Sequence, residues 1–484
     1  MSSAIKVKSK KGIKLKDSAF AVESTMHPPT TEQGVMQIAR QCTWAWPLVY
    51  LVVCLATATS LALPATPSSS HDSVCSVASY GAVCDNQTDD SAALQRVLDD
   101  PTCAVVQVAS PRHCVSKALN ISLMSGRTLQ IDRGAALVVW RDVLTYNLSH
   151  KTYSFLSATH VGDNDWEGPL LTDFTLNGGG AILGGGAMWW PYLKNISRPR
   201  TLLIPNGRNL HISNLTFVDS PSYNMGIRAN GVVIEYMNIS SGASRCGGYY
   251  DAPNTDGFNI GGSNITVRYS TVHNGDDCIP VTTYNSTVGT SNVHVHDVAC
   301  HCGTNGAVIY NQGGVVENIT FDRISVHGTN QGLGVKIANS KSNATSGVVR
   351  NVTWQNMRIT SPRYAAMYTN VFDEDASGCR YPSNPERGPG WLTVRDVRVE
   401  NVTAQLAVAG QPAACFLLSP GSPAAGWTFA NVTVTGTNGK PAAPYQCHNM
   451  VNITSQRSDS PVPCGGGGAG GAPRGKHAQE VKLR

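Results

Sequence analysis

A repeated spacing of apolar residues, which begins near residue 210, limits the folds open to this chain. In each repeat, apolar side chains stand at positions x, x+2, x+5 and x+7, which describes two short alternating strands separated by a bend. Successive repeats start 22 to 40 residues apart, so a constant unit accepts insertions of varying length, as in a solenoid. Ser270 is the one polar residue in the repeats, which are Leu210/Ile212/Leu215/Phe217, Val232/Ile234/Met237/Ile239, Ile265/Val267/Ser270/Val272, Val293/Val295/Val298/Cys300, Ile319/Phe321/Ile324/Val326, Val352/Trp354/Met357/Ile359, Leu392/Val394/Val397/Val399 and Trp427/Phe429/Val432/Val434.

The repeats favour parallel strands stacked coil on coil over an alternating α/β sheet. β-branched residues with Gly, Asn and Ser dominate, and helical patterns are missing between the strands. Before the repeats, Asp85 to Leu98 opens with capping residues and continues with apolar residues at helical spacing. The sequence therefore predicts an all-β fold, a right-handed single-stranded parallel β-helix (solenoid) with a short N-terminal capping helix.

The two ends of the chain differ from its body. The net charge of +5 belongs to residues 1–43 and 465–484, which are basic, whereas residues 73–464 carry a slight negative charge. This distribution argues against a nucleic-acid surface. The apolar run Trp44–Leu63 predicts a signal peptide, with Met36 as a possible true start and a membrane anchor as the alternative. We expect residues 1–72 to form the lead, signal peptide and linker, 73–464 the β-helix domain, and 465–484 a Gly-rich disordered tail.

The cysteines and the glycosylation motifs also suit an exported protein. Of 14 cysteines, 12 lie in the body, an even number that suits disulfides in an oxidising compartment, and their spacing does not fit a zinc site. There are 14 Asn-x-Ser/Thr motifs between Asn86 and Asn452. They are candidate glycan sites, although those that open a repeat equally suit turns between stacked strands. We expect a secreted, extracellular protein with no stable membrane association once the signal is cleaved.

Polar residues, two of them acidic, recur at one position of consecutive coils. Asp256, Asp277 and Asn305 each stand four residues before the last apolar residue of a strand, so coils in register would stack them about 4.8 Å apart. Asp276 adds a third carboxyl, which shares their side of the coil only if the chain bends there. Carboxylates this close hold one proton tightly, which suits a division into acid and base. The alternatives are ordinary turn residues or a Ca²⁺ site.

At these residues the chain resembles glycoside hydrolase family 28, the polygalacturonases. The marks are an Asn-Thr-Asp segment ending at Asp256 and an Asp-Asp-Cys segment one coil later, and the resemblance runs from about Ser76 to Val434. It implies inverting hydrolysis of pectin, in which Asp276 is the general acid and Asp256 and Asp277 activate water. It also implies that neither a metal nor another cofactor is needed.

The same resemblance implies further site residues. It places Asn254, Asn305 and Lys336 at the substrate and bridges Cys278 to a cysteine of the next coil, either Cys300 or Cys302. Three positions depart from the family pattern: Asn305 replaces a His, Lys336 replaces an Arg, and Ala338 replaces a Lys. Plain homogalacturonan is therefore not the only substrate to consider.

Several readings remain open at this point. We expect a monomer. The chain could hydrolyse another pectic backbone, such as rhamnogalacturonan or xylogalacturonan, or it could be a β-helix that binds sugar without cutting it. A lyase would need Ca²⁺ and a base, for which Arg245 and Lys336 are the candidates. Trp189, Trp190 and Tyr249 could stack on sugar rings or pack the edges of coils.

Overall fold

The computed structural model describes most of the body of the chain. The described residues are 73–146, 154–159, 167–192, 198–242, 246, 252–283, 288–337, 347–372, 379, 392–421, 423–440, 442–456 and 464. The predicted signal peptide or membrane anchor and the predicted Gly-rich tail lie outside them. So do Arg245, Tyr249 and Ala338.

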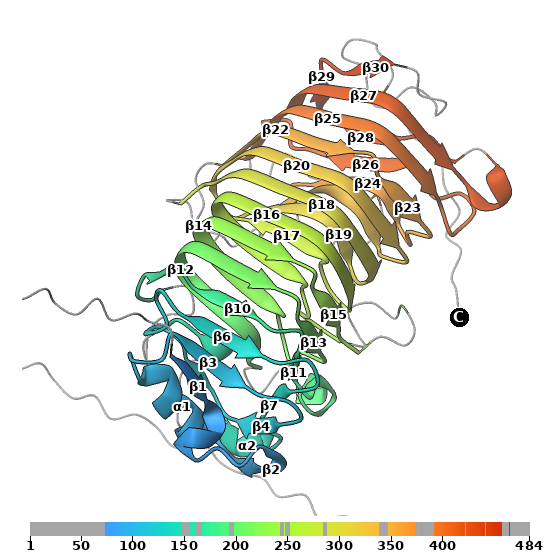
Figure 1. Ribbon diagram of the computed structural model, residues 1–484. Helices are drawn as coiled ribbons and strands as arrows, with labels where there is room; N and C mark the ends of the chain where they lie inside the picture. Colours follow the sequence, from blue (N-terminus) through green and yellow to red (C-terminus); the bar gives the residue numbers. More distant parts are fainter. Residues whose placement is uncertain are drawn as a thin grey trace, which may run out of the picture. The chain divides into compact units, whose positions relative to one another are not determined.

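The strands form a parallel β-helix with three stacks of strands (Figure 1). Parallel pairing from coil to coil joins each stack along the molecule, and the longer strands run from one stack into the next. The first stack consists of β1 (Val74–Ser76), β3 (Val105–Val108), β6 (Thr128–Ile131), β10 (Thr175–Asn177), β12 (Arg200–Ser213), β14 (Met225–Glu235), β16 (Phe258–Asn274), β18 (Thr290–Cys302), β20 (Gly314–His327), β22 (Gly347–Gln355), β25 (Leu392–Gln405), β27 (Ala424–Thr435) and β30 (Thr454–Gln456), with the short β9 (Leu171–Thr172) and β29 (Met450–Val451) beside it.

The other two stacks border the turn that carries the acidic residues. The second consists of β2 (Asp85–Asp89), β4 (His113–Ser116), β7 (Ala136–Val139), β11 (Ala181–Leu183), β13 (Thr216–Val218), β15 (Asn238–Ser240), the ends of β16, β18 and β20, then β23 (Arg358–Thr360) and the ends of β25 and β27. The third consists of β5 (Leu119–Asn120), β8 (Ser154–Ser157), the starts of β12, β14 and β16, then β17 (Ile279–Thr282), β19 (Asn305–Asn311), β21 (Gln331–Ile337), β24 (Ala365–Asn370), β26 (Ala414–Leu417) and β28 (Gln446–His448). Single turns of helix interrupt the coils at η1 (Val77–Tyr80), α2 (Val143–Tyr146), η2 (Gly186–Met188), η3 (Trp190–Tyr192) and η6 (Thr437–Gly439).

The register of the stacks matches the predicted repeats, with one exception. Leu210 pairs with Val232, and the pairing continues coil by coil through the first residue of each following repeat as far as Val352. The next partner is Val397, not Leu392, so the repeat placed at Leu392 is wrong by five residues. Strand β25 carries the same apolar spacing twice along its length, and only its neighbours in the stack select the register.

Asparagine ladders close the turns between coils. Asn264, Asn292, Asn318 and Asn351 follow one another along a turn, each with a φ between 51° and 57°. The side-chain amide of each donates to the side-chain oxygen of the Asn one coil before, at 2.7 to 3.3 Å. Asn tolerates this left-handed backbone better than most residues do, and the ladder satisfies its amide. Several sequon asparagines therefore have a structural role in the turns.

A capping helix covers the N-terminal end of the stack, as predicted. Helix α1 (Ser91–Asp99) buries Ala93, Leu94, Val97 and Leu98 against the core, but residues 85–89 form strand β2 and the helix starts later than its first polar residues suggested.

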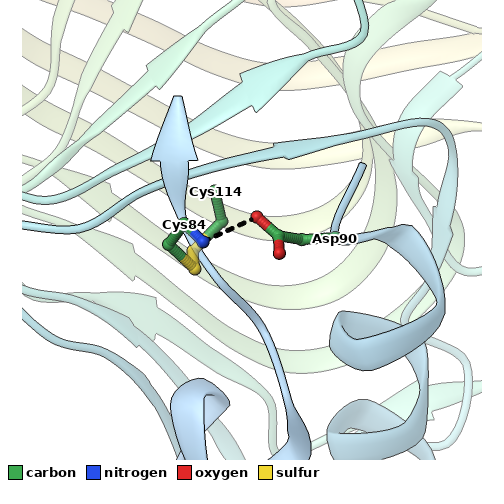
Figure 2. Close-up of side chains that lie close together, drawn as sticks. All are labelled: Cys84, Asp90 and Cys114. Atoms are coloured by element: carbon green, nitrogen blue, oxygen red, sulfur yellow. Dashed lines mark hydrogen bonds between the residues drawn. A yellow bond between two sulfur atoms is a disulfide. The ribbon is translucent and has the colours of Figure 1, made fainter. Parts of the chain in front are cut away.

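The residue before the helix, Asp90, lies beside Cys84 and Cys114 (Figure 2). The two cysteines form a disulfide, and the buried Asp90 carboxylate accepts the backbone N–H groups of Val83 and Cys84 at 2.7 and 3.0 Å. Because the two sulfurs are bonded to each other and the carboxylate accepts two backbone hydrogen bonds, these three residues have a structural role and do not form a metal site.

Disulfides link neighbouring coils along the body. All 12 body cysteines are paired, as Cys75–Cys103, Cys84–Cys114, Cys246–Cys302, Cys278–Cys300, Cys379–Cys415 and Cys447–Cys464. Within the described part of the chain, none of the helices has the length and apolar character needed to cross a membrane.

Candidate active site

The acidic residues lie at the turn between the second and third stacks. Asp256 immediately precedes β16, and Asp276 and Asp277 lie between the end of β16 and the start of β17. The backbone N–H of Gly257 donates to the carbonyl of Asp277 at 2.9 Å, and that of Cys278 donates to the carbonyl of Asn305 at 2.8 Å. Asp256, Asp277 and Asn305 therefore occupy equivalent places on three successive coils, as their common offset from the strand ends predicts.

The chain bends at Asp276 and Asp277, so their carboxyls face the same side. The Thr304 Oγ1 atom lies 2.7 Å from Asp276 Oδ1 and 2.5 Å from Asp277 Oδ1. The bend is held by buried Asn274, whose side-chain amide donates to the carbonyls of Thr255 and Asp277, both at 2.9 Å. The bend that the sequence required is present.

The Asp277 carboxylate is enclosed by donors. Lys336 Nζ lies 2.7 Å from Oδ2, and Asn305 Nδ2 donates to Oδ1 at 2.5 Å. Burial would lower the pKa of Lys336, but the charges of Asp277 and then Asp276 outweigh it and the pKa is raised. Lys336 is therefore an ammonium ion, with its Nζ 4.8 Å from the Tyr310 ring centroid, and Asp277 is its carboxylate partner.

The other two carboxyls hold protons more tightly than an ordinary aspartate. Burial first, and then the charge of Asp277, raises the pKa of Asp276 to about 6, although Lys336 and Thr304 oppose the rise. Burial, then Asp276 and Asp277, raises the pKa of Asp256 well above its usual range. Burial and the neighbouring charges thus raise the pKa values of Asp256 and Asp276, while Asp277 lies in an ion pair with Lys336.

A chain of contacts from Arg198 positions Asp276. The guanidinium of Arg198 donates to the carbonyls of Pro221 and Pro253 at 2.8 and 2.5 Å and to Asn254 Oδ1 at 2.6 Å. Asn254, at a φ of 55°, directs its Nδ2 at Asp276 Oδ2 over 3.4 Å. Asn254 therefore lies beside the cluster, and Arg198 fixes its orientation.

Sequence reasoning missed two contributors to this site. Neither Arg198 nor Thr304 was among the candidate residues that the sequence indicated. The sequence signal for Thr304 was its position: it carries a hydroxyl group, it precedes Asn305 of the predicted stack, and it lies one coil after the Asp-Asp pair.

Other candidate residues lie apart from the carboxyls. His301 stands in a column between His273 and His327 on the second stack, with ring centroids 6.4 and 6.3 Å away. Trp189 is fully buried and packs edge-on against Tyr146, so it belongs to the core and cannot stack on a sugar.

Trp190 and the cysteines near the acids have structural contacts. The Trp190 indole N–H donates to the Ser220 carbonyl at 3.2 Å. Cys278 is bonded to Cys300, while Cys302 is bonded to Cys246. The disulfide of Cys278 thus ties the residue after the acid pair to the next coil.

The fold and the carboxyl cluster together define a parallel β-helix protein that carries the groups acid–base hydrolysis requires. The sequence identifies the family within that class. Residues 148–458 match the model of glycosyl hydrolases family 28, and the chain belongs to this family. It is therefore a glycoside hydrolase of the polygalacturonase type.

Individual relatives are distant. A polygalacturonase from Penicillium griseoroseum is 25% identical over 309 residues, which cover 60% of this chain and 76% of the relative. A probable polygalacturonase from Arabidopsis thaliana is 30% identical over 238 residues, 46% of this chain and 48% of the relative, so the match spans about half of that protein. The crystal structure of a Thermotoga maritima exopolygalacturonase superposes with a TM-score of 0.60 at 14% identity, covering 80% of this chain and 92% of that chain, which shows the β-helix fold.

Proposed function

We propose that this glycoside hydrolase cleaves the backbone of a pectic polysaccharide with inversion. Asp276 is the general acid that protonates the leaving glycosidic oxygen, and Asp277 with Asp256 activates the attacking water. The observation that carries the assignment is the difference between adjacent carboxyls. Asp277 forms an ion pair with Lys336 at 2.7 Å, whereas the pKa of the half-buried Asp276 is raised to about 6, so that Asp276 can deliver a proton.

The division of labour between the two water-activating residues follows from their surroundings. Burial, then Asp276 and Asp277, raises the pKa of Asp256 well above its usual range, and Asp256 Oδ2 accepts a hydrogen bond from Asn259 Nδ2 at 3.1 Å. Asp277 is therefore the main base, and Asp256 orients the water. Thr304 Oγ1 contacts an oxygen of both carboxyls, so these oxygens lie closer together than the about 6.5–9.5 Å that usually separates acid and base in inverting enzymes, and inversion is proposed from the family resemblance.

Three side chains around the acids are proposed to contact the sugar. Asn254 and Asn305 border the carboxyls and present amide groups, and the side chain of Lys336 is 21% exposed. Because Lys336 reaches solvent, it can meet a uronate carboxylate of the substrate as well as Asp277. With Asn305 and Ala338 in place of a His and a Lys, a decorated or mixed pectic backbone is the alternative substrate to plain polygalacturonate.

The experiment is release of reducing sugar from polygalacturonate, rhamnogalacturonan and xylogalacturonan by purified wild type and Asp276→Asn. We expect hydrolysis of at least one substrate by wild type and a loss of about 100-fold or more in the variant. Asp173→Asn is the matched control, because Asp173 is exposed on a turn away from the site. Folded wild type that cuts none of the three would instead support a sugar-binding role, and unsaturated products that absorb ultraviolet light would support a lyase.

We further propose that residues 73–464 form the catalytic domain of a secreted monomer. The disulfide pairing of all 12 body cysteines supports an oxidising compartment, because cytosolic thiols are kept reduced. Cleavage between residues 63 and 73 upon expression in a secreting host, read by N-terminal sequencing, is the expected result. An uncleaved membrane-bound product would favour the anchor.

A further inference from the structure

One hydroxyl group stands between the acid and the base of the proposed reaction. Thr304 Oγ1 is 2.7 Å from Asp276 Oδ1 and 2.5 Å from Asp277 Oδ1, and both are hydrogen-bond distances. A hydroxyl has a single hydrogen to donate and lone pairs with which to accept. Thr304 can therefore donate to one carboxyl only, and the contact with the other is satisfied when that carboxyl carries the proton.

The surroundings decide which carboxyl is protonated at rest. Asp277 has Lys336 and the Asn305 amide as further partners, whereas Asp276 has the Asn254 amide at 3.4 Å besides Thr304. An ammonium beside Asp277 favours its carboxylate form, so Asp276 is the carboxyl that can carry a proton and donate a hydrogen bond to Thr304 Oγ1. The Thr304 hydroxyl in turn donates to Asp277.

We propose that Thr304 is a positioning residue whose hydroxyl switches its hydrogen bond between the base and the acid during each turnover. This inference rests on the proposed function. When the glycosidic C–O bond breaks, the Asp276 proton goes to the leaving oxygen. The water oxygen bonds to the anomeric carbon, and its proton goes to Asp277.

The switch follows from the proton positions after that step. Asp276 is now the carboxylate and Asp277 the acid, so the Thr304 O–H turns to Asp276 while Asp277 donates to Oγ1. No proton is gained or lost by the three groups together. A hydrogen bond to a carboxylate is about twice as strong as one between neutral groups, so the hydroxyl stabilises the charge that forms on Asp276.

The backbone holds the hydroxyl in this place. The Thr304 N–H donates to the Asp276 carbonyl at 3.0 Å, and its own carbonyl accepts from the N–H groups of Asn330 and Gln331 at 2.9 and 3.0 Å. Gly303, at a φ of 77°, lets the chain approach, because a Cβ there would lie 2.2 Å from the Asp276 carbonyl oxygen. The position of the hydroxyl is thus set by the coil and does not depend on substrate.

Several charged or titratable groups influence the acid, and each bears on the expected pH response. The charge of Asp277 raises the pKa of Asp276 and that of Lys336 lowers it, while the charge of Asp276 raises the pKa values of Asp256 and Tyr223. None of these groups is altered when Thr304 is replaced, so a change in the profile reports on the hydroxyl.

The test compares Thr304→Val with Thr304→Ser across pH. Valine keeps the shape but removes the hydroxyl, so kcat should fall about tenfold or more with KM within about twofold. The alkaline limb of kcat/KM should shift, because the hydroxyl that contacts both carboxyls is gone. Serine should restore both kcat and the limb. Thr353→Val, on the first stack, is the matched control for the same change in β22 and should behave as wild type.

The outcomes separate this inference from the proposed function. Hydrolysis by wild type that is lost in Asp276→Asn would support the proposed function. If Thr304→Val then keeps the wild-type kcat and the wild-type pH profile, the proposed role of Thr304 is wrong, although the proposed hydrolase function is still supported. If folded Thr304→Val loses activity but serine fails to restore it, shape and not the hydroxyl matters, and the inference is again overturned. Thermal unfolding of each variant establishes that it is folded.

Discussion

Lys336 Nζ lies 2.7 Å from Asp277 Oδ2, although the two residues belong to strands or turns two coils apart. This ion pair determines the charge distribution among the three acids. Asp277 is its anionic partner, and the ammonium also lowers the pKa values of Asp256 and Asp276, which burial raises. In the proposed reaction, the difference in surroundings between Asp277 and the other two acids divides them into base and acid.

Replacing Lys336 should therefore affect both stability and rate. In Lys336→Met, Asp277 keeps Thr304 and Asn305 but loses its counter-ion, so we expect a loss of about 3 kcal/mol in the free energy of unfolding. Hydrolysis should slow at least about tenfold, with the alkaline limb at higher pH because the ammonium no longer lowers the Asp276 pKa. Urea unfolding and pH–rate profiles measure the two effects. Lys440→Met, at an exposed position, should change neither.

The pKa of Asp276 predicts how activity depends on pH. A general acid must be protonated, so kcat/KM should fall as the pH rises through about 6. A profile that stays flat from pH 5 to 8 would contradict the assignment.

The same group predicts a pH-dependent stability. Its pKa in the folded chain lies above its ordinary value of 3.8, so the native state binds more protons between pH 3.8 and about 6. The stability from Asp276 is therefore complete below the lower value and is lost as pH rises through the upper one. In chemical unfolding at pH 4 and pH 7, the free energy of unfolding should decline less between the two pH values for Asp276→Asn than for wild type.

The disulfide beside the acid pair should stabilise the coils that carry it. Cys278 and Cys300 are fully buried and enclose a loop with a sequence separation of 22. Removing the bond in a Cys278→Ala/Cys300→Ala double variant should cost about 2–4 kcal/mol, in line with loops of this size. The urea midpoint of the oxidised protein is the measurement. An unchanged midpoint would mean that stacking alone holds this turn.

The asparagine ladder predicts a graded series at Asn318. Its amide donates to Asn292 Oδ1 at 3.1 Å and its φ is 57°. Asn318→Gly keeps the backbone conformation and loses the amide, whereas Asn318→Ala loses both, so alanine should be the less stable by about 1 kcal/mol. Equal midpoints for the two variants would show that the left-handed backbone carries no penalty here.

The sequence anticipated the acid stack but erred where its pattern fits two registers. Asp256, Asp277 and Asn305 were found because strands alternate with period two and stacked coils repeat the offset. In β25, the apolar spacing also fits when shifted by five residues, so Leu392 was chosen where Val397 is the residue in register. Trp189 was a candidate for sugar contact because the sequence does not show whether a Trp side chain is buried in the core or exposed at a binding site.

The sequence by itself determined the β-helix, the family and the three acids, because these depend on local spacing and on short motifs. Only the tertiary structure decided that Lys336 pairs with Asp277, that Arg198 orients Asn254, and that Thr304 lies between the two acids. These contacts join side chains from different coils. Their distances depend on the register and bend of each turn, which a pattern along one strand does not contain.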